Sequence, residues 1–469
     1  MVAAELNSRS PKTPNGHIPA HLAASASTTS IVSITSDMTP AEKDSMPLAS
    51  HLAKAAKTGA SNFILAYNVR AGIALLSRMV QLMQKRRFNE ILDLNVLLNE
   101  KHLHFRVEAV SMGLFIGSFT GGYEALKAIL RKLCPDLDEA GRTVVAGVAA
   151  GSGVVFLDHS RRRSLALYTF VRALQSLYNI AKARNMWHFW GSHWPHGDAL
   201  LFAITSAQVM YCFILRPDIL PKEYFAFIHR AGPVATKVLN FTQRSLRGGA
   251  IEPTEVMRFL EDKGSPVVYR LATAHPANLP CSLIHHGSES CTVGFAQTFW
   301  KAARATFPLY LSLNIVPRIV LRFHRFIKTP LISLLKGTWG GVRSTAFLGG
   351  FVAMYQATVC LQKSLFRSDS KISYFVAGLV ASTAVLLEAK SRRSELALYV
   401  LPRALDLLYI TLRDKRVLSD LPYGEVILFA CSMGAIMFCY EHEKQHLSPF
   451  VERLLHRFLD SHHPKPAAS

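Results

Sequence analysis

The chain contains one stretch twice, and this internal repeat constrains its fold more than any other feature. The stretch "HSRRRSLALYTFVRALQSLY" covers residues 159–178, and "KSRRSELALYVLPRALDLLY" covers residues 390–409, with twelve of twenty positions identical and no gap. Self-similarity at a fixed separation predicts two structural copies of one helical unit. The fold must therefore use a basic cluster, an apolar helix and an inner arginine twice.

The similarity extends on both sides of this stretch. "LFIGSFTGGYEAL" (114–126) matches "AFLGGFVAMYQAT" (346–358), and "PHGDALLFA" (195–203) matches "PYGEVILFA" (422–430). The separation falls from 232 to 231 to 227 residues, so the insertions lie in loops between apolar segments. Each copy contains four apolar segments that we expect to be helices, at residues 110–130, 143–158, 164–182 and 198–215, and again at 345–363, 372–388, 395–412 and 423–440.

The composition favours a membrane protein. Half of the 469 residues are hydrophobic, only 18% are charged and the mean hydropathy is +0.19, which is more apolar than the single core of a soluble helical bundle requires. Helices of these lengths span, or nearly span, a hydrocarbon core of about 30 Å. We expect an all-α integral membrane protein with two tandem four-helix repeats, each preceded by an amphipathic or partly inserted helix, at 63–83 and 307–323.

The formal net charge is +21, and the basic residues lie in short clusters at the ends of apolar segments. This placement is typical of membrane proteins, whose basic loops lie preferentially on one side of the membrane and contact anionic lipid headgroups. It argues against nucleic-acid binding. Both copies keep the cluster, so we favour parallel over inverted copies. The predicted interfacial basic residues are Arg161, Arg162, Arg392 and Arg393.

The chain divides into five expected regions. Residues 1–58 are rich in Ser, Thr, Pro and Ala, a composition typical of a disordered tail. The first membrane repeat with its preceding helix then covers 59–216, a connector with a Cys/His segment covers 217–300, the second repeat covers 301–445, and a C-terminal tail covers 446–469.

Several strings of the second copy resemble a known family. "FLGGFVAMYQATVCL", "FVAGLVAS", "SRRSELALYVLPRAL" and "PYGEVILF" are similar to the transmembrane protein 135 family, also called peroxisomal membrane protein 52, whose halves resemble Tim-type translocase subunits. "PCSLIHHGSESCTVGFAQTFWKAARATFPLYL" (280–311) resembles the Cys/His-containing segment of that family. In animal members this segment begins the chain, whereas here it lies between the copies.

The resemblance implies a multi-pass protein of peroxisomal and/or mitochondrial membranes. It implies fatty-acid or sterol handling and organelle dynamics, with membrane lipids and other organelle membrane proteins as partners. It brings no catalytic residues, and the sequence contains no nucleotide loop, nucleophile elbow or HExxH motif. We therefore expect no enzymatic activity and no cofactor. The alternative is a Tim-like translocation channel for polypeptides or small solutes.

Two inner arginines, Arg172 and Arg403, are predicted to lie near membrane depth. An unpaired charge there costs at least about 2.5–3.5 kcal/mol, so each needs a carboxylate partner or a wet groove. The candidate partners are Glu124, Asp198 and Glu425. Two roles stay open: a structural ion pair, or contact with a lipid headgroup or other anionic cargo.

Small residues and a Cys/His segment complete the candidate sites. The predicted helix-packing glycines are Gly117, Gly121, Gly147, Gly349 and Gly378. In the connector, Cys281, His285 and Cys291 are residue types that bind zinc. Their spacing matches no standard zinc finger, so we favour a polar connector over a metal site.

Overall fold

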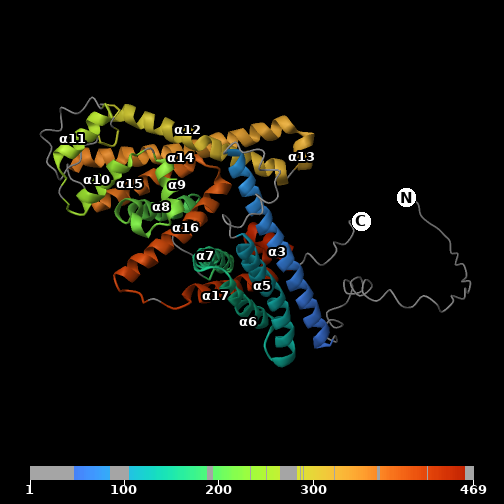
Figure 1. Cartoon of the computed structure of the whole chain (residues 1–469). Coiled ribbons are helices and arrows are strands. Elements are labelled where there is room, and N and C mark those ends of the chain that lie inside the picture. The colour runs from blue at the N-terminus through green and yellow to red at the C-terminus, as the bar shows by residue number, and fades with distance from the viewer. Residues whose placement is uncertain are drawn as a thin grey trace, which may run out of the picture.

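The computed structural model describes residues 47–84, 105–186, 194–232, 234–249, 251–264, 283–285, 287–288, 290–321, 323–366, 370–419 and 421–459. Within these ranges the fold is all-helical and contains no strand. Two long helix pairs, α3 with α5 and α12 with α14, frame the molecule, and α7, α8, α16 and α17 lie between them (Figure 1).

The predicted apolar segments are helical over most of their length. The first set forms α3 (Leu48–Gln84), α5 (Phe105–Leu133), α6 (Glu139–Gly151) with a 3-10 extension (Ser152–Phe156), α7 (His159–Ala183) and α8 (Gly197–Leu215). The second set forms α12 (Cys291–Leu321), α13 (Phe323–Lys328), α14 (Pro330–Phe366), α15 (Lys371–Ala381) with a 3-10 extension (Ser382–Leu387), α16 (Lys390–Asp414) and α17 (Gly424–His442).

The regions expected to be connector and tails also contain helices. The connector forms α9 (Lys222–Ala231), α10 (Thr236–Leu246) and α11 (Pro253–Asp262), and α10 and α11 build a small core of their own. Helix α3 already begins inside the expected N-terminal tail, while residues 1–46 lie outside the described residues. Helix α18 (Pro449–Leu459) occupies the expected C-terminal tail and buries two apolar side chains.

Side chains fix the start of the second helix in each copy at the same register. The Asp138 carboxylate accepts a hydrogen bond from the Gly141 N–H at 3.1 Å, and the Ser370 hydroxyl accepts one from the Ile372 N–H at 3.3 Å. Such caps satisfy backbone donors that a helix start leaves unpaired. The short helices α6 and α15 therefore begin 232 residues apart, in agreement with the repeat.

Glycines allow the long helices to approach each other closely. A Cβ on Gly117 of α5 would lie 2.8 Å from the Gly59 carbonyl oxygen of α3, and one on Gly121 would lie 2.9 Å from the Ala55 carbonyl oxygen. In the other pair, a Cβ on Gly349 of α14 would lie 3.2 Å from the Phe299 ring of α12. These small residues lie at helix contacts, as membrane helix packing favours.

The fourth helix of each copy packs against the other copy. Helix α8 packs on α15 and α16, and α17 packs on α6 and α7. Two aromatic pairs show the correspondence: the Phe115 and Phe429 ring centroids are 5.6 Å apart, and those of Phe202 and Phe347 are 5.7 Å apart. The two sets of helices therefore share their cores and are not self-contained four-helix units.

Two predicted packing glycines lie where the fourth helix of one copy packs on the second helix of the other copy. A Cβ on Gly147 of α6 would lie 3.0 Å from the Gly434 Cα of α17, and one on Gly378 of α15 would lie 2.7 Å from the Ala207 Cα of α8. Gly434 and Ala207 are 227 residues apart, so the same contact is built twice.

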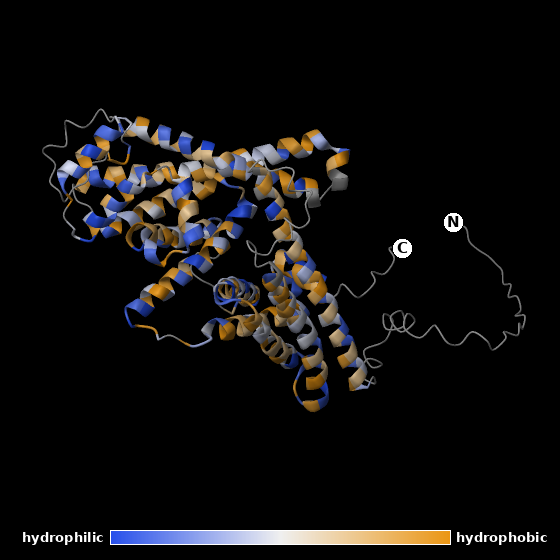
Figure 2. Ribbon diagram, in the orientation of Figure 1, coloured by the Kyte–Doolittle hydropathy of each residue, from blue (hydrophilic) through white to orange (hydrophobic). Residues whose placement is uncertain are grey.

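Among the described residues, three helices are long and apolar enough to cross a membrane: α8, α14 and α17. A shorter apolar stretch covers Lys371–Leu387. We expected all four segments of each copy to cross the membrane, so α5, α6, α7, α15 and α16 differ from that expectation. Helices α7 and α16 carry charges that they pair with each other. In Figure 2, α8 is mostly orange, whereas α10 and α11 alternate between blue and orange.

Candidate functional site

Arg172 is only 3% exposed and lies where α7 crosses α16. Its Nη2 donates to Glu395 Oε2 at 2.6 Å and to the Tyr168 hydroxyl at 3.1 Å, and its Nη1 donates to Gln175 Oε1 at 3.0 Å. The guanidinium also lies over the Tyr168 ring, 5.4 Å from its centroid. A buried charge is tolerated only with such partners. The repeated inner arginine of the first copy is therefore held by the second copy.

A second ion pair joins the same two helices. Arg163 near the start of α7 pairs with Asp406 in the second half of α16 at 2.7 Å, whereas Arg172 pairs with Glu395 near the start of α16. The two ion pairs therefore hold the start of α7 against the second half of α16, and the middle of α7 against the start of α16. The parallel orientation of the two copies in a membrane stays a prediction.

The predicted carboxylate partners of the inner arginines lie elsewhere. Asp198 accepts a hydrogen bond from the Ala199 N–H at the start of α8, Glu425 approaches Arg162 at 3.8 Å, and Glu124 lies on α5. Arg403 is half-buried on α16 and has no ion pair among the residues that the structure describes. The two arginines of the repeat are therefore not equivalent in the structure.

The arginines of the basic clusters bind neighbouring helices and helix ends. Arg161 donates to Glu108 at 2.6 Å, and these contacts hold the pKa of the Glu108 carboxyl below its usual range. Arg392 donates to Glu388 at 2.9 Å and to the Ser344 hydroxyl at 3.0 Å. Arg393 donates to the Leu386 carbonyl at 2.7 Å. About two fifths of the Arg161 and Arg392 side chains stay exposed, at 38% and 43%.

A polar cavity of about 350 Å³ lies at the crossing of α7 and α16. Its charged lining residues are Arg172, Arg392, Glu388 and Glu395, whose formal charges cancel. Two of their buried atoms, Arg172 Nε and Glu388 Oε2, have no hydrogen-bond partner among the described residues. Both atoms belong to residues that line the polar cavity.

An apolar cavity of about 230 Å³ lies next to the polar cavity, between α8, α9, α12, α14 and α16. Its lining is mainly aromatic and branched aliphatic, with Phe202, Val209, Met210, Phe351 and Val400 among the side chains. Tyr355 also lines it, and the Tyr355 hydroxyl is buried without a hydrogen-bond partner among the described residues. Such a pocket binds apolar ligands that carry a few polar atoms.

Four side chains line both cavities: Tyr310, Phe347, Leu396 and Tyr399. Tyr399 is 59% exposed, so the boundary between the cavities reaches the protein surface. Burial raises the pKa of Tyr310 and of Tyr224 to about 12. Both hydroxyls therefore stay neutral and can donate hydrogen bonds at any physiological pH.

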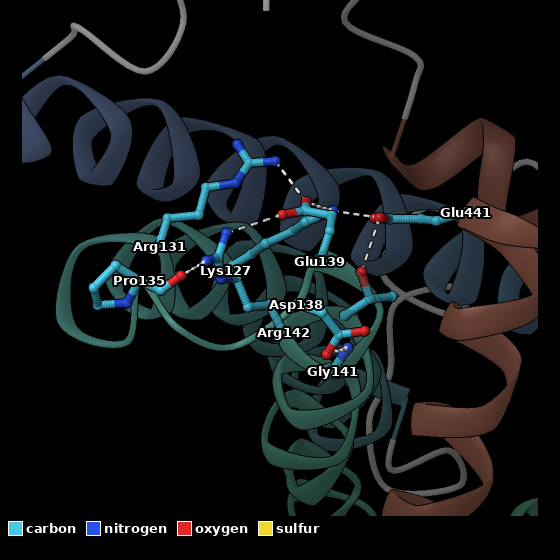
Figure 3. Close-up of polar contacts among 9 residues, drawn as sticks. Lys127, Arg131, Pro135, Asp138, Glu139, Gly141, Arg142 and Glu441 are labelled. Carbon is cyan, nitrogen blue, oxygen red and sulfur yellow. Dashed lines mark hydrogen bonds and ion pairs between the residues drawn. The ribbon is translucent and has the colours of Figure 1, made fainter.

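The corresponding place in the first copy is filled by ion pairs (Figure 3). Glu441 of α17 accepts hydrogen bonds from Tyr123 and Lys127 of α5, and from the Thr143 hydroxyl at 3.0 Å. Lys127 also pairs with Glu139 at 3.1 Å. Burial raises the pKa of the Glu139 carboxyl, but hydrogen bonds from Arg131 and Lys127 outweigh it and lower the pKa to about 2.

Sequence reasoning missed the two acids of the polar cavity. Glu388 and Glu395 lie in the second copy at positions where the first copy has Leu157 and Ser164, 231 residues earlier. They could have been identified by comparing equivalent positions of the two copies, because an acid stands in one copy where the other has an apolar or neutral residue. The pairing of Glu395 with Arg172 could not be found this way, because it depends on how the two copies cross.

The Cys/His segment contains a cluster of three potential metal ligands. His285 and Cys291 lie together with Cys360 of α14, and their ligand atoms are all within 4.8 Å of one another. The third predicted candidate, Cys281, lies outside the described residues. Cys360 was missed because it is 69 residues beyond Cys291 on a different helix.

The helices of the described residues, three of which are long and apolar enough to cross a membrane, place the chain in the class of all-helical integral membrane proteins. Residues 278–411 match the family model described as the N-terminal cysteine-rich region of Transmembrane protein 135. The match covers the end of the connector and α12 to most of α16, and it supports the resemblance of this part of the chain to the transmembrane protein 135 family. No solved structure matches the chain. The likeness of the repeats to Tim-type subunits stays a prediction.

Proposed function

We propose that the protein binds a membrane lipid in its two adjoining cavities and moves or presents it without covalent chemistry. One observation carries the proposal: a polar cavity with an unused buried donor and acceptor shares four lining residues with an apolar cavity. A lipid has the same division into a polar head and an apolar body. From the family resemblance we also propose a Tim-like organisation of the two repeats. The same resemblance suggests a peroxisomal or mitochondrial membrane and a role in organelle dynamics.

The apolar cavity supports a hydrophobic ligand on energetic grounds. Each methylene that leaves water for such a site contributes about 0.8 kcal/mol. The ring-rich lining, with Phe202, Phe213 and Phe351, suits a rigid ring system as well as an acyl chain. The cavity is too apolar to favour a hydrated solute or an extended polypeptide, so we favour lipid binding over a translocation channel.

The polar cavity favours a neutral hydroxyl head over a carboxylate. Its two arginines are already neutralised by two glutamates, and Glu388 Oε2 is an unused buried acceptor that repels an anion. A lipid hydroxyl donates one hydrogen bond and accepts others, so it fits both Glu388 Oε2 and the N–H at Arg172 Nε. We therefore propose a hydroxyl-bearing lipid, of which sterols are the best match to the ring-rich cavity.

Equilibrium binding to the purified full chain in detergent tests this function. A fluorescent sterol and a fluorescent fatty acid of similar apolar area are titrated at pH 7. The wild type should bind the sterol saturably and more tightly than the fatty acid. Glu388→Gln should weaken sterol binding about tenfold, because a hydrogen bond to a charged group is lost, and should improve binding of the anionic fatty acid.

The matched control for this variant is Glu108→Gln. Glu108 is also an arginine-bound glutamate, paired with Arg161 in the first copy, and it lines neither cavity. Its replacement should leave both affinities unchanged. Sterol and fatty acid binding equally in the wild type, or an equal loss in both variants, would contradict the proposed site.

A further inference from the structure

Residues 283–285 at the end of the connector lie against the α10–α11 core and two long helices. Leu283 is only 1% exposed and packs into the small core that α10 and α11 form. Two residues later, His285 is 8% exposed and meets Cys291, the first residue of α12, and Cys360, which is 2% exposed on α14. Three separate elements thus bring two thiols and one imidazole to one point.

The histidine is oriented as a metal ligand requires. Its Nδ1 lies 3.1 Å from the Ser288 carbonyl oxygen, so Nδ1 carries the proton and donates it there. The lone pair is then on Nε2, which lies 3.3 Å from Cys291 Sγ. Two ligands of a tetrahedral zinc ion with Zn–N and Zn–S bonds of about 2.1 and 2.3 Å are about 3.6 Å apart. A hydrogen bond from the second ring nitrogen to a backbone carbonyl is the usual support of a zinc-binding histidine.

Gly294 makes room for this arrangement. A Cβ at this position of α12 would lie 2.8 Å from the Cβ and 2.9 Å from the Cγ of His285. The His285 ring packs edge-on against Phe295, with centroids 6.4 Å apart. The imidazole is therefore packed between Gly294 and Phe295 of α12.

We propose that His285, Cys291 and Cys360 bind a zinc ion. Thiolate and imidazole ligands select zinc over magnesium or calcium, and two thiolates with one Zn²⁺ give a site of zero net charge. Binding would release the two thiol protons to solvent. The fourth position of the tetrahedron is left for a water molecule or another side chain.

The zinc site would also close one end of the apolar cavity. Ile284 and Val359 line that cavity, and each is the chain neighbour of a proposed ligand, His285 or Cys360. An ion at this point would fix the connector, α12 and α14 relative to one another. The proposal stands without the lipid, because metal content is measured on the protein alone.

Metal analysis of the purified full chain tests the site. The protein is loaded with Zn²⁺ in detergent under reducing conditions, passed over a desalting column and measured for zinc per chain. The wild type should retain one zinc. Cys360→Ala should bind zinc more than tenfold more weakly, and Gly294→Ala should weaken binding without removing any ligand. The matched control is Cys212→Ala, since Cys212 is a buried thiol of α8 outside the cluster.

A cobalt spectrum provides a second readout in case a cysteine variant folds poorly. Co²⁺ bound to two thiolates gives a near-ultraviolet charge-transfer band, and Cys291→His should keep the metal while losing about half of that band. The proposal would be overturned if monodisperse wild type held no zinc, or if the Cys360→Ala and Cys212→Ala variants held equal zinc. A Cys291–Cys360 disulfide that persists under reducing conditions would also overturn it.

Discussion

Tyr123 and Tyr355 occupy the same register of the two copies, 232 residues apart, but their surroundings differ. The Tyr123 hydroxyl donates to Glu441, which also binds Lys127 and Thr143. The Tyr355 hydroxyl has no partner among the described residues and lines the apolar cavity. Ion pairs and hydrogen bonds fill the space beside Tyr123, whereas the equivalent space beside Tyr355 is a cavity.

The residues around the two tyrosines explain the difference position by position. Lys127, Thr143 and Glu441 correspond to Val359, Tyr374 and Ile214, at separations of 232, 231 and 227 residues. All three counterparts line the apolar cavity. The helix arrangement is thus kept in both copies, while a few polar positions decide whether the space is filled or open. We infer that the core between α5, α6 and α17 stabilises the fold, and that the equivalent core between α14, α15 and α8 binds the ligand.

The largest expected loss of stability comes from removing Glu441, the shared acceptor in the ion-paired core. Glu441→Ile, which installs on α17 the residue found at the equivalent position of α8, Ile214, leaves Lys127, Tyr123 and Thr143 without their shared acceptor. The free energy of unfolding should fall by about 3 kcal/mol, because the Tyr123 and Thr143 hydroxyls lose their acceptor and Lys127 keeps only its ion pair with the partly exposed Glu139. Denaturant titration in micelles measures it. Lys127→Val/Glu441→Ile should recover a large part of the loss, and a double variant no more stable than the single one would contradict this explanation.

A phenylalanine placed in both copies should distinguish filled from open space. Val209 of α8 and Ile436 of α17 are equivalent and almost fully buried, but only Val209 lines the cavity. Ile436→Phe should overpack its core and cost about 2 kcal/mol. Val209→Phe should cost less than about 0.5 kcal/mol and abolish sterol binding. Equal destabilisation by the two changes would show that the second copy is as tightly packed as the first.

The exchanged helices can be tested at their glycines. Gly378→Ala should lower the free energy of unfolding by about 1.5 kcal/mol, because its Cβ would lie 2.7 Å from the Ala207 backbone. Gly350→Ala, whose Cβ would meet only side chains at 3.5 Å or more, should be neutral or stabilising. Thermal unfolding of both variants measures the difference, and an equal response would argue against the packing of α8 on α15.

The smallest effect is expected from acid. The Glu139 pKa is lowered to about 2, so its ion pairs stabilise the folded state above pH 4.5 and this contribution is lost as the pH falls toward 2. Solvent screening of this partly exposed carboxylate keeps the contribution below about 1 kcal/mol. Glu139→Gln should remove that part of the pH dependence. The second copy begins the equivalent helix with Lys371 and has no such step at this position.

The sequence was sufficient for the helices but not for their partners. Periodicity and the repeat predicted all eight apolar segments, because each helix depends on its own residues. The exchange of α8 and α17 could not be predicted, since a helix-packing motif such as Gly147 or Gly378 does not specify which helix it contacts. Arg172 was identified as a buried charge, but its partner Glu395 belongs to the other copy and has no local spacing signal. Cys360 was missed for the same reason.

Photocrosslinking with a diazirine sterol in nanodiscs tests the central claim most directly. Crosslinks are mapped by mass spectrometry in wild type and in Val209→Phe. The account predicts crosslinks at Met210 and Phe351 of the apolar cavity that disappear in Val209→Phe. It predicts none at their equivalents, Met437 and Phe119, which lie in the closed core of the first copy. Equal crosslinking at both sets of residues, or cavity crosslinks that persist in Val209→Phe, would contradict it.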